Sequence, residues 1–184
     1  MNDHSHETDA AVASGSALEF RAVWERRLAA AWASIDEHSE PSFLALIEGL
    51  VAQLPADDPT GVFERAASLD STGHSDLAVP LYASALSLGL VGERRRRAVI
   101  QMASSLRNLG RSSESVSLLT AEMDAGSDHL DDAVRGFLAL ALTDVGRERE
   151  AVSLALGALA PHLPRYQRSL GNYARLLVAA DEDD

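Results

Sequence analysis

The residues of this chain best suited to chemistry are arginines gathered in one short stretch. Residues 91–111 contain six arginines and one acid, Glu93, so the stretch carries a charge of +5 (six minus one) in a chain of net charge −12. Guanidinium groups bind carboxylates through paired hydrogen bonds in one plane. The stretch is therefore a candidate binding site for an acidic peptide segment.

Part of this stretch forms a polar face. Arg97, Gln101, Ser104 and Asn108 are separated by four, three and four residues, which places them on one side of a helix. Arginines that flank this face complete the candidate site, whose residues are Arg94, Arg97, Gln101, Ser104, Arg107 and Asn108. A second interpretation stays open, in which the face is solvated and its arginines pair with the protein's own carboxylates.

Few residues suit enzyme chemistry. The chain has no cysteine, and all 16 basic residues are arginine, which excludes disulfides, thiol nucleophiles, Schiff-base lysines and a Walker lysine. The GxSxG, GxGxxG, HExxH and P-loop patterns are absent, and the histidines are scattered. We therefore predict that the protein is not an enzyme, with no catalytic residues, no cofactor and no metal site.

Composition limits the fold and the partners. The 184 residues are 46% hydrophobic but only 5% aromatic, a mixture that favours close-packed helices. No apolar run is long enough to cross a membrane, and the acidic, polar N-terminus is unlike a secretory signal. The net charge of −12 opposes binding to nucleic acid. These features predict a cytoplasmic protein without membrane or nucleic-acid partners.

A repeated sequence motif indicates the elements that must position the arginines. A leucine stands four residues before each of three glycines, which are spaced 37 and 36 residues apart: Gly73, Gly110 and Gly146. An alanine precedes each glycine by seven residues, and a small residue followed by valine begins five residues after it. A period of this size predicts stacked helical hairpins, in which each glycine ends the first helix of a pair.

These repeats resemble the tetratricopeptide repeat family over residues 59–162. The first copy carries the family's small, apolar and aromatic residues in register: Ala66, Leu69, Gly73, Ala78, Tyr82 and Ala85. The second helix of the middle copy departs from the pattern, with Ser115 and Glu122 where the family has alanine. The family's early tryptophan is missing throughout, and Val62, Val99 and Arg135 stand there.

The resemblance implies a right-handed superhelix whose concave groove holds protein or peptide ligands. It places Arg97, Gln101, Ser104 and Asn108 on the groove. The family's carboxylate-clamp subgroup uses lysine and asparagine at set groove positions, whereas this chain has no lysine and has Ser104 at one of them. A clamp for a chaperone tail is therefore not expected.

The predicted organisation is all-α, with four parts. A disordered tail (1–15) precedes an N-terminal helix pair (16–55), followed by three repeats within 56–162 (about 59–92, 93–127 and 128–162) and by a capping helix with an acidic tail (163–184). Trp24 and Trp32 are eight residues apart, on one face of the first helix. They are interpreted as core of the helix pair, or as an exposed patch for dimerisation.

The predicted function is non-catalytic binding of an unidentified protein or peptide in the groove of the repeats, with an acidic ligand segment favoured. The alternative is a structural homo-oligomerisation module, such as a homodimer, in which the arginine cluster pairs with an acidic surface of a second copy.

Overall fold

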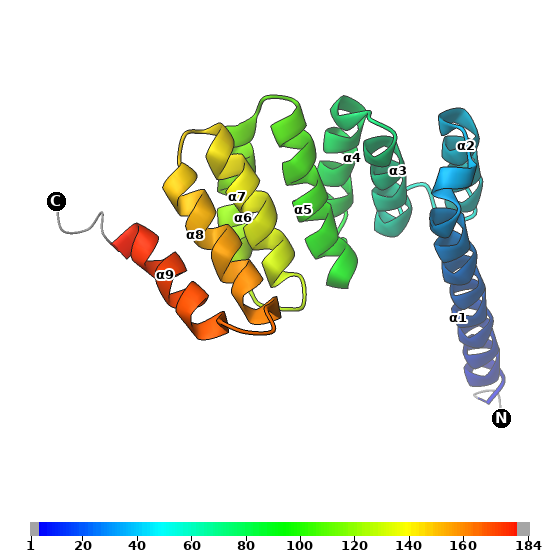
Figure 1. The fold of residues 1–184 in the computed structure, drawn as a ribbon. Coiled ribbons are helices and arrows are strands. Elements are labelled where there is room, and N and C mark those ends of the chain that lie inside the picture. Colours follow the sequence, from blue (N-terminus) through cyan, green and yellow to red (C-terminus); the bar gives the residue numbers. More distant parts are fainter. Residues whose placement is uncertain (1–3, 180–184) are drawn as a thin grey trace. The chain divides into compact units, whose positions relative to one another are not determined.

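The computed structural model describes the backbone of residues 4–179 and the side chains of residues 15–179. The chain divides into two compact units, unit 1 (Met1–Ala56) and unit 2 (Asp57–Asp184), and each is described by itself. Within the described residues every regular element is helical (Figure 1). The predicted all-α class is thereby confirmed.

Unit 1 is a helix pair. It contains α1 (His4–Ala33), a 3-10 turn (Ile35–Glu37) and α2 (Glu40–Val51). Trp24 is buried, and its indole Nε1 donates a 2.8 Å hydrogen bond to the carbonyl oxygen of Leu50. Trp32 packs edge-on against Phe43, with ring centroids 5.2 Å apart. Both tryptophans therefore belong to the core of this pair.

The first helix begins earlier than its apolar spacing predicts. That spacing predicts a tail over residues 1–15 and a helix start near Ser16, whereas α1 begins at His4 and only residues 1–3 of that segment lie outside the described residues. Residues 4–15 contain Ala10, Ala11 and Ala13, and alanine has the highest intrinsic helix propensity. Apolar spacing reveals only amphipathic helices, so it does not reveal a helical segment that depends on intrinsic helix propensity.

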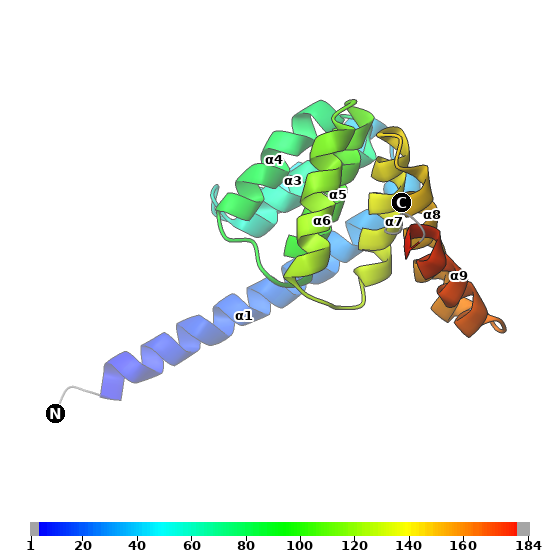
Figure 2. The same cartoon turned by 90° about the vertical axis from the view of Figure 1, so that its left-hand side faces the viewer.

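Unit 2 is an array of helical hairpins. The hairpins are α3 (Pro59–Ser71) with α4 (Ser75–Ser87), α5 (Gly92–Asn108) with α6 (Ser112–Ala125), and α7 (Asp131–Asp144) with α8 (Glu148–Leu159). A last helix, α9 (Gln167–Ala179), follows a 3-10 turn (Ala160–His162). Each helix contacts the next, and the first helices of the hairpins (α3, α5 and α7) also contact one another (Figures 1 and 2). This arrangement is that of an α-solenoid.

The repeated sequence motif forms the turns between paired helices. Gly73, Gly110 and Gly146 have φ values of 91°, 74° and 79°, in the left-handed region that favours glycine. In each turn the residue after the glycine donates its N–H to the carbonyl oxygen of the leucine of the motif, at 2.9 Å. The glycine and the leucine therefore act together as one helix-ending unit.

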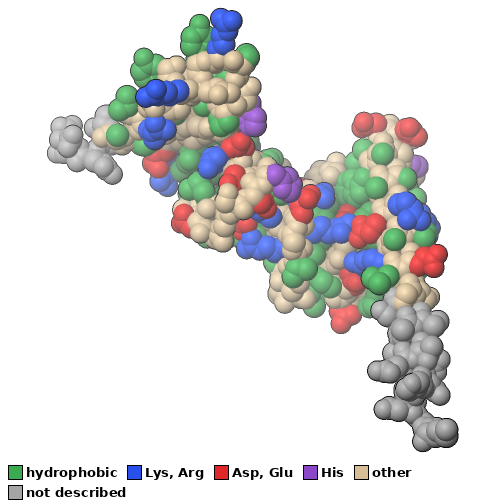
Figure 3. Space-filling model, turned by 90° about the horizontal axis from the view of Figure 1, so that it is seen from below, with side chains coloured by type: hydrophobic (Ala, Val, Ile, Leu, Met, Phe, Trp, Pro, Cys, Tyr) green, Lys and Arg blue, Asp and Glu red, His purple; other side chains and the backbone are tan. Residues whose placement is uncertain are grey.

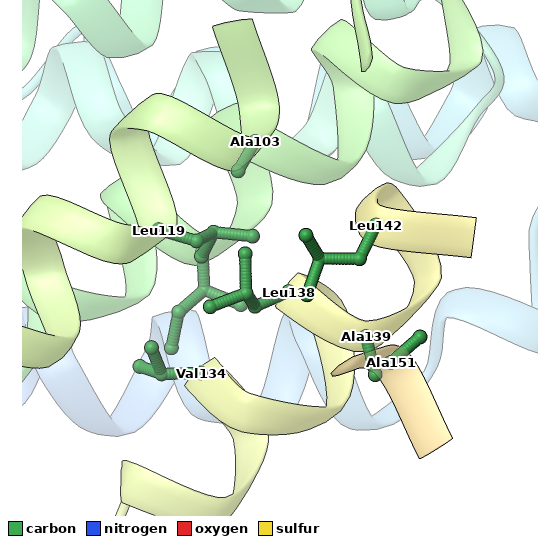
Figure 4. Close-up of a cluster of buried hydrophobic side chains, with 8 residues drawn as sticks. Ala103, Leu119, Val134, Leu138, Ala139, Leu142 and Ala151 are labelled. Carbon is green, nitrogen blue, oxygen red and sulfur yellow. The ribbon is translucent and has the colours of Figure 1, made fainter. Parts of the chain in front are cut away.

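Apolar layers fill the space between successive hairpins. Figure 4 shows the layer that joins the second and third repeats, where side chains from α5, α6, α7 and α8 point toward one another. Its buried members are Ile100, Ala103, Leu119, Val134, Leu138, Ala139, Leu142 and Ala151. Alanines let the helix backbones approach closely, and the larger residues fill the remaining volume.

A partly buried polar network lies between the first two repeats. Asp70 on α3 accepts hydrogen bonds from the Ser105 hydroxyl on α5 at 2.6 Å and from the Tyr82 hydroxyl on α4 at 3.3 Å. Burial raises the pKa of Tyr82, and the Asp70 carboxylate raises it further. Tyr82 therefore remains a protonated donor, and one carboxylate joins three helices.

Candidate functional site

Helix α5 carries the arginine cluster, and its consecutive arginines reach different neighbours. Arg94 extends toward α3, where its Nε lies 2.9 Å from Oε1 of Glu64. The Glu64 side chain is only 2% exposed. Arg94 therefore neutralises a buried carboxylate and links the first two repeats.

Arg95 and Arg96 extend to the following hairpins. Arg95 Nη1 pairs with the carboxylate of Glu122 on α6. Arg96 is buried and lies among three carboxylates, 2.7 Å from Asp131, 3.1 Å from Asp128 and 3.6 Å from Glu122. These anions offset the cost of placing several arginines at a helix N-terminus, where the helix dipole opposes positive charge.

The departure of the middle repeat from the family pattern now has a structural reason. Glu122 stands where the family has alanine, and it is buried beside two guanidinium groups. The alanine-to-glutamate change on α6 and the arginine run on α5 therefore form one feature.

Arginines at the other end of α5 are also paired. Arg107 Nε lies 2.5 Å from Oδ2 of Asp144 on α7, and the same oxygen accepts a 3.2 Å bond from the Ser112 hydroxyl. Arg111 donates two hydrogen bonds, of 2.6 and 2.7 Å, to the Glu114 carboxylate, and these bonds lower the pKa of the Glu114 carboxyl. Arg107 thus joins α5 to α7, whereas the Arg111 pair is exposed and local.

Arg97 differs from the other five arginines of the cluster. Its guanidinium lies over the ring of Phe63, 5.4 Å from the centroid. It makes no ion pair with any residue that the structure describes. It also lines a pocket of about 410 Å³ at the N-terminal ends of α3 and α5, together with Pro59, Thr60, Gly89, Leu90, Val91, Glu93 and Arg94.

The three uncharged residues of the candidate site lie along α5. Gln101 and Ser104 are half-buried, and the Oε1 atom of Gln101 is buried without a hydrogen-bond partner among the described residues. Asn108 is exposed, and its Nδ2 donates to the Ser75 hydroxyl at 3.5 Å. The helix therefore places Gln101 one turn beyond Arg97, and of these two residues Arg97 lines the pocket.

Each of the two interpretations of the arginines describes part of the cluster. Arg94 and Arg107 are held in ion pairs with neighbouring helices, as the solvated-face interpretation expected for the whole cluster. Arg97, Gln101 and Ser104 keep the arrangement that the groove interpretation needs, and their binding role stays a prediction. Sequence reasoning missed the partners Glu64 and Glu122, although an acid at a position where the family has alanine was a usable signal for Glu122.

No group of three or more histidine, aspartate or glutamate side chains is placed to hold a metal ion in the part of the chain that the structure describes. Among the helices of residues 4–179, none combines the length and the apolar character needed to cross a membrane.

A row of helical hairpins closed by glycine turns defines a repeat scaffold. The tetratricopeptide repeat profile matches residues 59–177, and the chain belongs to this family. The match continues beyond residue 162 through most of α9, so the last helix is part of the repeat pattern. Proteins of this family are generally non-catalytic scaffolds for protein–protein interaction. No curated protein and no solved structure gave a significant match to the chain.

Proposed function

We propose that unit 2 binds an acidic peptide segment of another protein, with Arg97 as the main anchor for a ligand carboxylate. One observation carries this proposal. Arg97 lines a pocket and rests on an aromatic ring, whereas the other five arginines of the cluster bind carboxylates of the chain itself.

The contact with Phe63 suits Arg97 for this role. Phe63 is fully buried, so its ring gives the guanidinium a fixed surface to rest on. A cation–π contact uses the face of the guanidinium and leaves its N–H edge available for the two oxygens of a carboxylate. The partly ordered side chain then loses less entropy when a ligand binds.

Gln101 supports a peptide ligand in particular. Its Oε1 is a buried acceptor without a partner among the described residues, and it stands one helical turn beyond Arg97. A backbone N–H of an extended peptide would satisfy this acceptor while a ligand side chain reaches Arg97. The pair would then recognise both the charge and the backbone of the ligand.

The test is fluorescence anisotropy with a fluorescein-labelled peptide of eight glutamates. Arg97→Ala should weaken binding by roughly 10-fold or more, because a hydrogen bond to a charged group contributes about 1.5–3 kcal/mol. Arg111→Ala is the matched control, since it removes one exposed arginine of the same cluster and should change the affinity less than about 3-fold. Equal affinities of wild type and Arg97→Ala, with unchanged circular dichroism, would refute the proposal.

Arg94→Ala is unsuitable for this test. Its loss would disturb the buried Glu64 carboxylate, so weaker binding would have two possible causes. The polar face alone predicts that a combined substitution of Arg94, Arg97 and Arg107 leaves folding nearly intact. The ion pairs of Arg94 and Arg107 predict instead that this triple variant is destabilised.

The alternative, pairing of the arginine cluster with a second copy, has less support. Five of the six arginines already bind carboxylates within the described part of the chain. Sedimentation at increasing salt separates the two functions, because a dimer that dissociates with salt would favour self-pairing.

A further inference from the structure

A second arginine-lined pocket lies at the far end of unit 2, where α7, α8 and α9 meet. Its volume is about 620 Å³. Three arginines line it, Arg135, Arg168 and Arg175, and no acid does. The pocket shares no residue with the one beside Arg97.

Small residues form the floor of this pocket because α9 docks closely on α8. A Cβ atom at Gly171 would lie 3.8 Å from the Cβ atom of Ala160. Ala174 is buried, and its carbonyl oxygen accepts a 2.8 Å hydrogen bond from the Ser153 hydroxyl. The short side chains bring α9 close to α8 and to the 3-10 turn that follows it, and they line the pocket together with the arginines.

The charges around the pocket are strongly unbalanced. Residues 163–179 contain three arginines and no acid. Arg168 makes no ion pair with any described residue, and Arg175 Nη2 donates to the amide oxygen of Asn172. Arg135 pairs with Asp132 at 2.8 Å, and Asp132 also lies 2.9 Å from Nε2 of His162. In Figure 3, blue and green side chains lie together at the left-hand end of the molecule, where Figure 1 places α9.

We propose that this pocket binds an acidic peptide segment, with Arg168 and Arg175 holding its carboxylates and Arg135 adding positive potential. The site is separate from the one at Arg97 and goes beyond the function proposed above. The guanidinium groups supply paired donors for carboxylates, and the small apolar floor accepts the methylene groups of aspartate and glutamate side chains.

The charges also select this occupant over two others. Symmetric pairing of α9 with α9 of a second copy would bring arginines of like charge together, which disfavours it. A nucleic acid would be repelled by the chain's net charge of −12. An acidic peptide of another protein complements the pocket and is short enough to avoid the remaining acidic surface.

The experiment uses the full chain and a fluorescein-labelled peptide Asp-Glu-Asp-Asp, with Asn-Gln-Asn-Asn as its neutral control. Introduced together into Arg97→Ala, so that the first pocket does not contribute, Arg168→Gln and Arg175→Gln should weaken anisotropy-detected binding by roughly 10-fold or more relative to Arg97→Ala alone, because two charge-assisted contacts are lost. Arg111→Gln should match wild type. Equal binding with and without the two glutamine substitutions in Arg97→Ala, or equal binding of the neutral peptide, would overturn the proposal.

Two further arms test which site and which ligand chemistry the peptide uses. Arg97→Ala should leave binding at this pocket unchanged. A loss of binding caused by Arg97→Ala but not by the double variant of Arg168→Gln and Arg175→Gln would assign the peptide to the first pocket and overturn the proposal for the second pocket. Inorganic phosphate should compete only weakly, and competition at the peptide's own concentration would overturn the assignment to carboxylates.

A last arm tests an occupant from the chain itself, which contains an acidic run at 181–184. Neutralising this run by Asp181→Asn, Glu182→Gln, Asp183→Asn and Asp184→Asn should leave the affinity within about twofold, because the pocket is open to the added peptide. A 10-fold increase would show that this run is the occupant and would overturn binding of another protein.

Discussion

Replacing Asp70 by alanine should destabilise unit 2 more than any change of an exposed acid. The Asp70 carboxylate accepts hydrogen bonds from Ser105 at 2.6 Å, from Tyr82 at 3.3 Å and from Ser75 at 3.5 Å. Ser105 and Tyr82 are both 0% exposed. Asp70 itself is half-buried, so water can replace the lost acceptor only in part unless the contacts among α3, α4 and α5 open.

The size of the effect follows from this geometry. Two fully buried hydroxyl groups lose their shared acceptor in Asp70→Ala, and each unsatisfied buried group costs about 1–2 kcal/mol. The expected loss in free energy of unfolding is about 2–4 kcal/mol, equivalent to roughly 8–15 °C in melting temperature for a unit of this size. Tyr82→Phe removes a donor and leaves Asp70 bonded to Ser105, so its loss should be smaller, about 1 kcal/mol.

Urea unfolding followed by far-ultraviolet circular dichroism is the assay. Both tryptophans lie in unit 1, so their fluorescence does not report on unit 2 directly. Asp124→Ala is the matched control, because it removes an exposed acid of α6 and should change stability by no more than about 0.5 kcal/mol. If Asp70→Ala and this control have the same unfolding midpoint, the network does not stabilise the fold and the reasoning is wrong.

Two further predictions test the turns and the charged surface. Gly73→Ala should reduce the free energy of unfolding by about 1–2 kcal/mol, because Gly73 has φ 91°, although the space around it is open. Gly136→Ala inside α7 should instead increase the free energy of unfolding by about 0.5–1 kcal/mol, because alanine favours a helix interior over glycine. A gain in melting temperature for Gly73→Ala would contradict the left-handed turn. The hydrogen bond from His162 and then that from Arg135 lower the pKa of Asp132, so an NMR titration should give a value below that of an ordinary aspartate, and this value should rise in His162→Ala. Because the folded-state pKa is the lower one, this carboxylate stabilises the fold above the unfolded-state pKa, and the contribution is lost as the pH falls through the lowered value; an unchanged pKa in His162→Ala would contradict the assignment.

Much of the fold was predictable because its signals are local. A leucine, three intervening residues and a glycine specify a helix end, and the 36- to 37-residue period specifies that the hairpins repeat. The start of α1 was not predictable in the same way, since residues 4–15 rest on helix propensity and lack an apolar stripe.

The candidate site shows the limit of such reasoning. Spacing along one helix placed Arg97, Gln101 and Ser104 on a common face, and α5 has that face. Spacing could not say which arginine would meet a carboxylate, because Glu64 and Glu122 lie on other helices and become neighbours of α5 only when the hairpins stack.

The sequence by itself therefore determined the family, the hairpin turns and the location of the arginine cluster, since each depends on residues close together in the chain. Only the tertiary structure decided that Arg94, Arg96 and Arg107 join helices and that Arg97 faces a pocket, because ion pairing depends on distances between segments 30 or more residues apart. It also revealed the pocket at α9, whose three arginines come from two helices separated by a hairpin turn and a whole intervening helix.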